Sequence, residues 1–419
     1  MEDTGTGGMN AHAKLEGLYS RWALPSDTDD DDRQGDLLEK NKPAALWVDD
    51  GPWLEVEITR RPWIAPGYLM RGAVTVVSGP GSAGKSSLLV GWSIALALGK
   101  RWHRFFPAGP MRVFNYNVED DRLEQQRRMS ATLRQFEAAP GDLAGKVVRI
   151  GPNSTGTLLR RDPISGRLGF TAAMRMLETM IAERKPDVLI LDPLVELHDA
   201  EENDNTAIRA VMAKFRALAV EHNMAVVLIH HARKGAGSSA GDPDSLRGAS
   251  SIVGAARVVL TVLTMDEEQA AKLGIQPKER GKYFRVDGAK SNYAPLHDAE
   301  WFQRIEYQLD NEEGVAAAVP WEPPSAFGNI TPTALNTVLD QIAAGPSPGI
   351  LYSPTKRGGS SRWCGQVLMD EAEMEEARAK QIIAQWIESG LLHKTTFHHP
   401  ELRRDVPGVL VDNAKRPTE

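Results

Sequence analysis

Residues 73–86 read Ala-Val-Thr-Val-Val-Ser-Gly-Pro-Gly-Ser-Ala-Gly-Lys-Ser. A short β-branched run at 73–78 leads into a glycine-rich turn, and an apolar stretch with helical character follows at 86–98. The turn fills the pattern G-x-x-x-x-G-K-[ST], in which backbone N–H groups surround phosphate oxygens and a helix N-terminus adds its positive dipole end. The sequence therefore predicts a nucleotide-binding phosphate loop between a strand and a helix.

The pattern gives each position of the loop a task. Lys85 is expected to reach the β- and γ-phosphates of ATP, and the Ser86 hydroxyl is expected to bind Mg²⁺. The alternative, a glycine-rich turn without a ligand, is disfavoured because strand, loop and helix follow in the required order. The predicted nucleotide-binding residues are Gly79, Pro80, Gly81, Ser82, Ala83, Gly84, Lys85, Ser86 and Ser87.

Two carboxylates follow apolar strand-like runs. Asp192 closes the run at 187–191 and is the predicted second ligand of Mg²⁺. Pro193 follows it, so a catalytic glutamate is missing from that position and the base must come from elsewhere. Glu119, after the run at 113–118, is the predicted base that activates water. The alternative is that the acidic run from Glu119 to Asp121 only caps the next helix.

Short strands alternate with longer helices from about residue 73 to residue 229. Strands are expected at 73–78, 112–118, 147–150, 188–191 and 225–229, with a polar helix at 121–137. This order predicts an α/β fold with a mainly parallel twisted sheet flanked by helices. Strand-like runs at 258–263, 283–286 and 301–307, around a charged helix at 266–273, predict an antiparallel extension of that sheet.

The chain divides by composition into four predicted parts. Residues 1–50 hold 12 acidic against 5 basic residues and are expected to be a solvated tail. Residues 51–310 form the nucleotide-binding domain, and 311–330 form a proline-rich linker. Residues 331–419 are expected to be a small winged-helix-like α+β domain, with helices at 332–342 and 373–389 followed by strands at 393–397 and 406–411.

Charge and cysteine content exclude several classes of protein. The net charge of −7 resides in the tail, because the remaining residues carry 44 basic and 44 acidic side chains. This balance excludes a uniformly basic nucleic-acid coat but permits a local basic channel. The single cysteine, Cys364, supplies neither an internal disulfide nor a zinc cluster. Without a membrane-length apolar run or a secretory leader, a soluble cytoplasmic protein is expected.

Several motifs in one order resemble the RepA-like hexameric ATPases, RecA-type P-loop NTPases of plasmids and phages that include a replicative helicase. The resemblance covers about residues 60–310. The motifs that carry it are Asn117-Val-Glu-Asp120, Leu191-Asp-Pro-Leu194, Glu202-Asn-Asp-Asn205, Ile229-His-His-Ala-Arg-Lys234, Ser245-Leu-Arg-Gly-Ala-Ser250 and Ala289-Lys-Ser-Asn-Tyr293. It implies a RecA-like fold, Glu119 as base, Asp192 on Mg²⁺, and His230 or His231 as γ-phosphate sensor. His231 is preferred for the sensor, and metal binding by this pair is the alternative.

The resemblance also implies residues that act on a neighbouring subunit. Arg257 matches the family's arginine finger, which stabilises transition-state charge in the adjacent site. Its alternative is a structural ion pair. Lys290 lies where related helicases place a second trans-acting cation. Two loops are expected to face nucleic acid through Arg233, Lys234, Arg160 and Arg161, with a solvated excursion as the alternative.

Together these features predict an ATP-hydrolysing, Mg²⁺-dependent hexameric ring motor that moves on single-stranded DNA as a replicative helicase. The alternative is an ATPase that switches or loads a DNA-processing partner without unwinding. A small-molecule kinase is disfavoured because the sequence shows no lid-like arginine cluster. The C-terminal domain, with ten basic and ten acidic residues in 351–419, fits either duplex contact or docking of replication proteins.

Overall fold

The computed structural model describes residues 51–151, 156–201, 204–231, 241, 250–296, 299–323, 332–356, 362–372 and 374–416. The chain divides into two compact units, Met1–Arg60 and Arg61–Glu419. In the first unit the described residues contain the short 3-10 helix Glu55–Glu57. All elements below belong to the second unit.

A nine-stranded sheet organises this unit, in the order β13-β12-β11-β10-β3-β9-β8-β4-β5. Its parallel part consists of β10 (Val258–Thr264), β3 (Val74–Gly79), β9 (Ala225–His231), β8 (Val188–Asp192), β4 (Val113–Asn117) and β5 (Val147–Ile150). The antiparallel part consists of β11 (Tyr283–Ser291), β12 (Glu300–Gln308) and β13 (Gly314–Trp321). The predicted parallel sheet is confirmed. The predicted antiparallel extension is confirmed for β11 and β12 but is wrong for residues 258–263, because β10 pairs with β3 in parallel.

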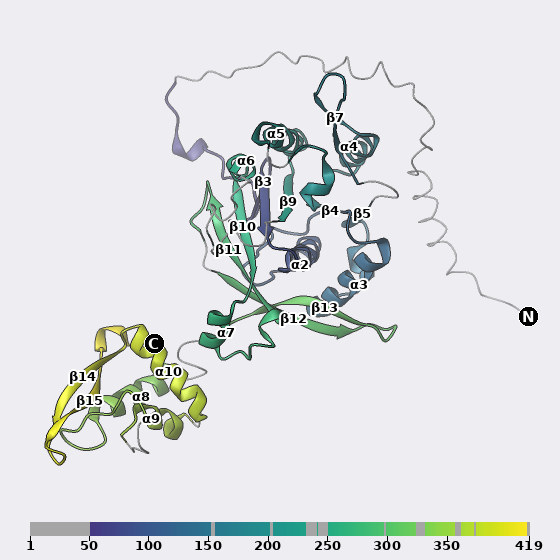
Figure 1. Cartoon of the computed structure of the whole chain (residues 1–419). Coiled ribbons are helices and arrows are strands. Elements are labelled where there is room, and N and C mark those ends of the chain that lie inside the picture. The colour runs from purple at the N-terminus through teal and green to yellow at the C-terminus, as the bar shows by residue number, and fades with distance from the viewer. Residues whose placement is uncertain are drawn as a thin grey trace, which may run out of the picture. The chain divides into compact units, whose positions relative to one another are not determined.

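Helices cover both faces of the sheet (Figure 1). One face packs against α2 (Lys85–Leu98) and α3 (Arg122–Leu133), and the other against α4 (Ala172–Arg184), α5 (Asn205–Glu221) and α6 (Ser250–Ala255). Neighbouring residues of β3 show why both faces are needed, because Val77 belongs to the first core and Val76 to the second. Successive strand side chains point to opposite faces, so a strand buried on both sides reads as a continuous apolar run.

Smaller elements complete the body. These are the strand pairs β1 (Trp63–Ala65) with β2 (Leu69–Met70) and β6 (Leu159–Arg161) with β7 (Leu168–Phe170), and the helix α7 (Glu267–Leu273). Arg160 and Arg161, which were expected in a loop, lie instead on a strand of the β6–β7 hairpin. Among the described helices, none is long and apolar enough to cross a membrane.

The predicted linker at 311–330 needs correction in its first half. Residues 314–321 form β13, which pairs with β12 over its whole length. Prolines suggested a linker, but β13 is the edge strand of the sheet, where the missing N–H of Pro320 is tolerated. Ala317 and Ala318 are buried, which anchors the strand. Residues 324–330 lie outside the described ranges.

The C-terminal residues have a hydrophobic core of their own. It contains Leu335, Trp363, Ile382, Trp386 and Val409. The elements are α8 (Pro332–Ala344), α9 (Cys364–Glu371), α10 (Glu376–Glu388), β14 (Leu392–His399) and β15 (Arg404–Val411). Helices followed by a two-stranded ladder agree with the predicted order, and α9 is a further helix that was not predicted. The winged-helix assignment stays a prediction.

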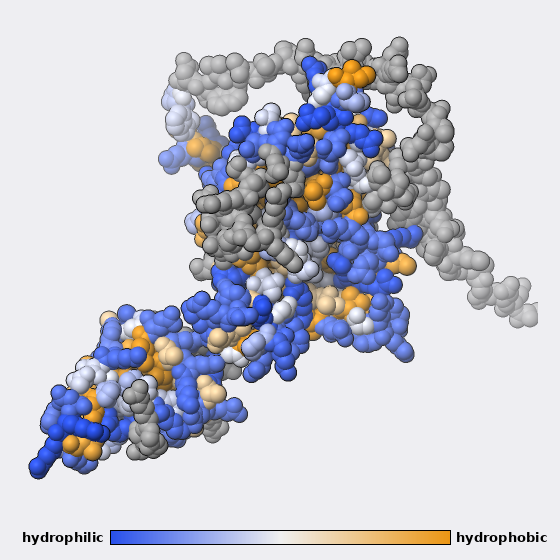
Figure 2. Space-filling model, viewed as in Figure 1, coloured by the Kyte–Doolittle hydropathy of each residue, from blue (hydrophilic) through white to orange (hydrophobic). Residues whose placement is uncertain are grey.

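Hydrophilic residues cover most of the face of the body seen in Figure 2, and apolar residues appear there in small groups. Such scattered apolar residues are normal for a protein surface.

Candidate functional site

The phosphate loop connects β3 to α2, as the sequence predicted. Lys85 is the first residue of α2 and is only 4% exposed, and its amine donates hydrogen bonds to the carbonyls of Gly79 and Pro80, both at 2.8 Å. Burial lowers the pKa of Lys85 to about 8, while the charges of Asp192 and Glu119 act in the opposite direction. The two hydrogen bonds thus hold the Lys85 amine against the backbone of the glycine-rich loop.

Two glycines of the loop have no substitute. A Cβ on Gly79 would lie 2.1 Å from the carbonyl oxygen of Val262, because β3 and β10 approach closely there. Gly84 has φ +113° and lies against the ring of Phe284. Glycine is required at Gly79 because a Cβ would clash with the backbone of β10, and at Gly84 because positive φ is combined with the ring contact.

Arg304 holds the loop from a distant strand, and sequence reasoning missed it. Its guanidinium donates to the carbonyl of Ser82 at 2.7 Å and lies 5.2 Å from the centroid of the Phe284 ring. Burial lowers the pKa of Arg304. A strand of the antiparallel extension, β12, therefore supports the phosphate loop through Arg304.

Asp192 ends β8 and points a buried carboxylate toward the loop. Burial raises its pKa to about 6, against a hydrogen bond from Ser86 and the positive charge of Lys85. Its Oδ1 atom is buried and has no hydrogen-bond partner among the described residues. An unpartnered carboxylate oxygen beside a hydroxyl is the donor set that Mg²⁺ prefers. Ser86 and Asp192 therefore fit the metal that the loop implies.

Glu119 and His231 lie beside Asp192, although they end different strands. The Nε2 atom of His231 is 3.8 Å from the Oε1 atom of Glu119. One ligand-type atom from each of Glu119, Asp192 and His231 lies within 4.8 Å of the others. A half-exposed carboxylate, a buried carboxylate and an imidazole thus surround one point next to the phosphate loop.

The structure separates Glu119 from the task of capping the next helix. Asp121 is the N-cap of α3, and its side chain accepts a hydrogen bond of 2.7 Å from the backbone N–H of Glu124. The backbone N–H groups of Glu119 and Asp120 donate to the side chain of Asn117. The Glu119 carboxylate is therefore left to point toward Asp192 and His231.

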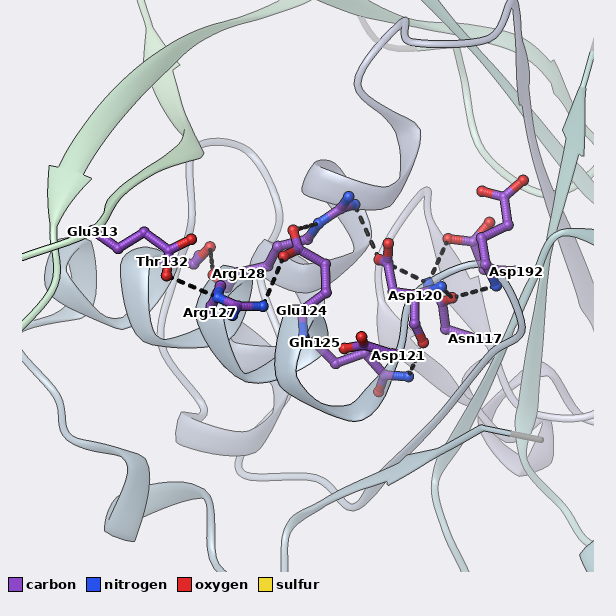
Figure 3. Close-up of polar contacts among 11 residues, drawn as sticks. Asn117, Asp120, Asp121, Glu124, Gln125, Arg127, Arg128, Thr132, Asp192 and Glu313 are labelled. Atoms are coloured by element: carbon purple, nitrogen blue, oxygen red, sulfur yellow. Dashed lines mark hydrogen bonds and ion pairs between the residues drawn. The ribbon is translucent and has the colours of Figure 1, made fainter. Parts of the chain in front are cut away.

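A chain of polar contacts runs from Asp192 to α3 (Figure 3). The Nδ2 atom of Asn117 lies 3.4 Å from both the Asp192 and Asp120 carboxylates, and Arg128 pairs with Asp120 at 3.1 Å and with Glu124 at 2.8 Å. Burial raises the pKa of Asp120, and Arg128 lowers it. The sequence motif contained Asn117 but gave it no role. Its position at the end of a strand was the signal that could have indicated a place in the site.

His230 occupies the other face of β9 from His231. Its Nδ1 atom lies 3.2 Å from the Oγ atom of Ser78, and burial lowers its pKa to about 4, with further lowering by His231 and Lys85. The imidazole is therefore neutral at neutral pH. A neutral ring fixed to the phosphate-loop strand is a hydrogen-bonding group rather than a cation.

The shifted pKa of His230 predicts a pH dependence of stability. The unfolded chain binds a proton near pH 6.5 and the folded chain only near pH 4, so stability falls as pH falls between these values. From pH 7 to pH 5 the loss from this residue is about 2 kcal/mol. In urea unfolding at pH 7 and at pH 5, the free energy of unfolding of His230→Gln should fall by about 2 kcal/mol less than that of wild type. His222→Gln, a histidine at the end of α5, is the matched control, and an equal loss in all three proteins would contradict the prediction.

The phosphate loop lies where the parallel strands end, which we call the carboxyl edge of the sheet. Arg257 and Lys290 lie near the beginning of those strands, which we call the amino edge. Arg257 precedes β10, and its N–H donates to the carbonyl of Val74 at the start of β3. Five residues of strand separate Val74 from Gly79, about 16 Å at 3.3 Å per residue. Arg257 is exposed. It therefore cannot reach the phosphate loop of its own chain.

Lys290 has partners within its own chain. Its amine donates to the carbonyls of Val253 at 2.7 Å and Ala256 at 2.9 Å, at the C-terminal end of α6. Burial and the nearby Arg257 lower its pKa. A lysine at this place neutralises the negative end of a helix and satisfies its last carbonyls. The geometry favours a structural role over the predicted trans-acting one.

The predicted nucleic-acid contacts are only partly described. Arg233 and Lys234 lie outside the described residues. Arg160 and Arg161 are exposed on β6, where a guanidinium nitrogen of Arg161 donates to the carbonyl of Gly166 inside the hairpin. Arg161 therefore stabilises the hairpin, and contact with nucleic acid stays a prediction for all four residues.

Comparison with known families agrees with the geometry of the loop and the strand ends. Residues 39–237 match the family model of an AAA domain, a range that includes the phosphate loop, Glu119, Asp192 and both histidines. The mixed α/β sheet with its phosphate loop is consistent with a P-loop NTPase domain. The match and the site together suggest a P-loop ATPase that binds and hydrolyses a nucleoside triphosphate, usually with Mg²⁺.

Proposed function

We propose that the protein is an ATP-hydrolysing ring motor of RepA-like type that moves on single-stranded DNA. The observation that carries the proposal is the distribution of charge over two sheet edges. Lys85, Asp192, Glu119 and His231 meet at the carboxyl edge, while the exposed Arg257 lies at the amino edge. In a ring, one subunit's amino edge faces the next subunit's carboxyl edge, which completes each site with an arginine.

Each residue has a task in hydrolysis. Lys85 and the loop N–H groups hold the β- and γ-phosphates, and Ser86 and Asp192 hold Mg²⁺, which neutralises phosphate charge when bound. Glu119 orients the attacking water and accepts its proton. His231, 3.8 Å from Glu119, senses the γ-phosphate and passes its presence to the chain beyond β9. Arg257 of the adjacent subunit stabilises the charge that develops in the transition state.

The proposal is tested by the steady-state ATPase rate with and without single-stranded DNA, with the mass of the same sample measured by light scattering. We expect a several-fold higher rate with single-stranded DNA in a species of hexamer size. Duplex DNA and single-stranded RNA of equal length are the matched controls, because a pore that holds one strand by its phosphates discriminates by shape and flexibility. Strand separation on a tailed duplex then tests the helicase assignment.

One outcome would overturn the ring-motor proposal and another would change its substrate. A rate from a monomer or dimer that does not respond to nucleic acid supports the second candidate, an ATPase that switches or loads a DNA-processing partner. Stimulation by RNA alone would replace the substrate. In the second candidate function, the C-terminal residues would bind the partner protein. Their own hydrophobic core supports this role, because it lets them form a separate folded part.

A further inference from the structure

One aromatic ring contacts two arginines at the amino edge of the sheet. The guanidinium carbon of Arg61 lies 5.4 Å from the centroid of the Tyr293 ring, and that of Arg257 lies 5.7 Å from the same centroid. Arg61 comes just before β1, Arg257 just before β10, and Tyr293 just after β11. Both arginines are exposed and the tyrosine is half-buried. Three segments distant in sequence thus present two positive charges at one place.

The ring stabilises an arrangement that the two charges alone would oppose. Like charges repel, whereas the negative face of an aromatic ring attracts a guanidinium within about 6 Å. Arginine suits this contact because its planar group stacks on a ring and is weakly hydrated. An exposed pair of arginines without the ring would spread over many rotamers. The ring restricts both side chains to one region of the surface.

The backbone places the ring next to Arg257. The N–H of Asn292 donates to the carbonyl of Arg257 at 3.1 Å, and the N–H of Ala294 donates to the hydroxyl of Ser291 at 3.1 Å. These bonds fix the residues on both sides of Tyr293. Lys290 adds no outward charge, because its amine is bound to the carbonyls at the end of α6. Within the part of the chain that the structure describes, the charge directed outward around this ring therefore comes from Arg61 and Arg257.

We propose that Tyr293 is a positioning residue that holds Arg61 and Arg257 as a pair, and that both guanidinium groups bind the triphosphate in a second copy of this chain. The inference rests on the proposed function, because it needs a site completed by a neighbour. It replaces Lys290 with Arg61 as the second trans-acting cation. Two guanidinium groups match the spread of negative charge over the β- and γ-phosphate oxygens better than one.

Single variants test the positioning role. Tyr293→Ala should lower kcat roughly five- to thirtyfold, the factor expected for the loss of two cation–π contacts at an exposed site, with binding of a fluorescent ADP analogue unchanged. Tyr293→Phe keeps the ring and should retain wild-type activity. Equal loss in both variants would show that the hydroxyl, not the ring, matters and would overturn the proposal. Circular dichroism and mass on the same samples establish that the variants fold and assemble.

Mixing two variants tests whether Arg257 completes the nucleotide site of a neighbouring subunit. Lys85→Ala destroys a subunit's own loop but leaves its amino edge intact, and Arg257→Ala does the reverse. A mixture of these two inactive proteins should regain activity at the interfaces that combine an intact loop with an intact arginine. Without any regain in this reference mixture, the neighbour-completed site of the proposed function fails, whatever Tyr293 does.

Tyr293→Ala and Arg61→Ala should behave as Arg257→Ala does. Each should regain activity when mixed with Lys85→Ala and gain none when mixed with Arg257→Ala. Regain with Arg257→Ala, while the reference mixture works, would overturn the inference and leave the proposed function intact. Wild-type activity of Arg61→Ala alone would overturn the assignment of Arg61 as the second cation.

Discussion

The Lys85→Ala variant is expected to hydrolyse ATP roughly 10²- to 10³-fold more slowly than wild type, because a preorganised positive group at the transferring phosphate is lost. Lys85 is buried at the start of α2, and its amine donates hydrogen bonds to the loop carbonyls of Gly79 and Pro80. Among the described residues, the nearby Ser86 and Arg304 cannot take its place, since Ser86 is a hydroxyl and Arg304 donates to the carbonyls of Ser82 and Gly281. The phosphate would then face the loop without its cation.

The measurement is a coupled ATPase assay together with titration of a fluorescent ATP analogue. Affinity should fall as well, because the amine contacts the ground state and the transition state alike. Lys278→Ala, an exposed lysine away from the sheet edge, is the matched control and should equal wild type. A Lys85→Ala rate above one tenth of wild type would mean that the loop does not bind the hydrolysed phosphate.

Glu119→Gln is expected to separate binding from hydrolysis. The amide keeps the shape of the side chain but cannot accept the proton of water, so hydrolysis should fall roughly 10²- to 10⁴-fold. Binding of ATP should be kept or strengthened, because one negative charge near the triphosphate is removed. Nucleotide recovered from the purified protein after incubation with ATP should then be ATP, whereas wild type yields ADP.

Asp121→Asn is the matched control for Glu119→Gln, because it removes the same charge two residues further along. Asp121 caps α3, and asparagine is an equally good N-cap. The control should keep its activity and its stability. Full activity of Glu119→Gln together with a loss in Asp121→Asn would show that this acidic run serves only the helix.

Several parts of the site were beyond any sequence pattern. Arg304 supports the loop at Ser82 across 222 residues, and nothing near either residue signals the contact. Asn117 stood in a motif, but its link between Asp192 and Asp120 depends on β4 lying next to β8. Lys290 matched the position of a trans-acting cation, yet α6 ends within reach of its amine. Such contacts follow from how strands pair, which local propensity does not encode.

The sequence by itself determined the phosphate loop, the carboxylates at the ends of two strands and the presence of an antiparallel extension, although it placed the start of that extension one strand too early, at residues 258–263. These features are local: a loop pattern, an apolar run and its last residue are contiguous, and strand ends of a parallel sheet share one edge. The tertiary structure decided which groups meet across that edge, such as His231 beside Glu119, and which meet at the other edge, such as Tyr293 beside Arg61 and Arg257. It also turned residues 314–321 from a predicted linker into β13, because the edge of the sheet accepts a strand with a proline that a central position would reject.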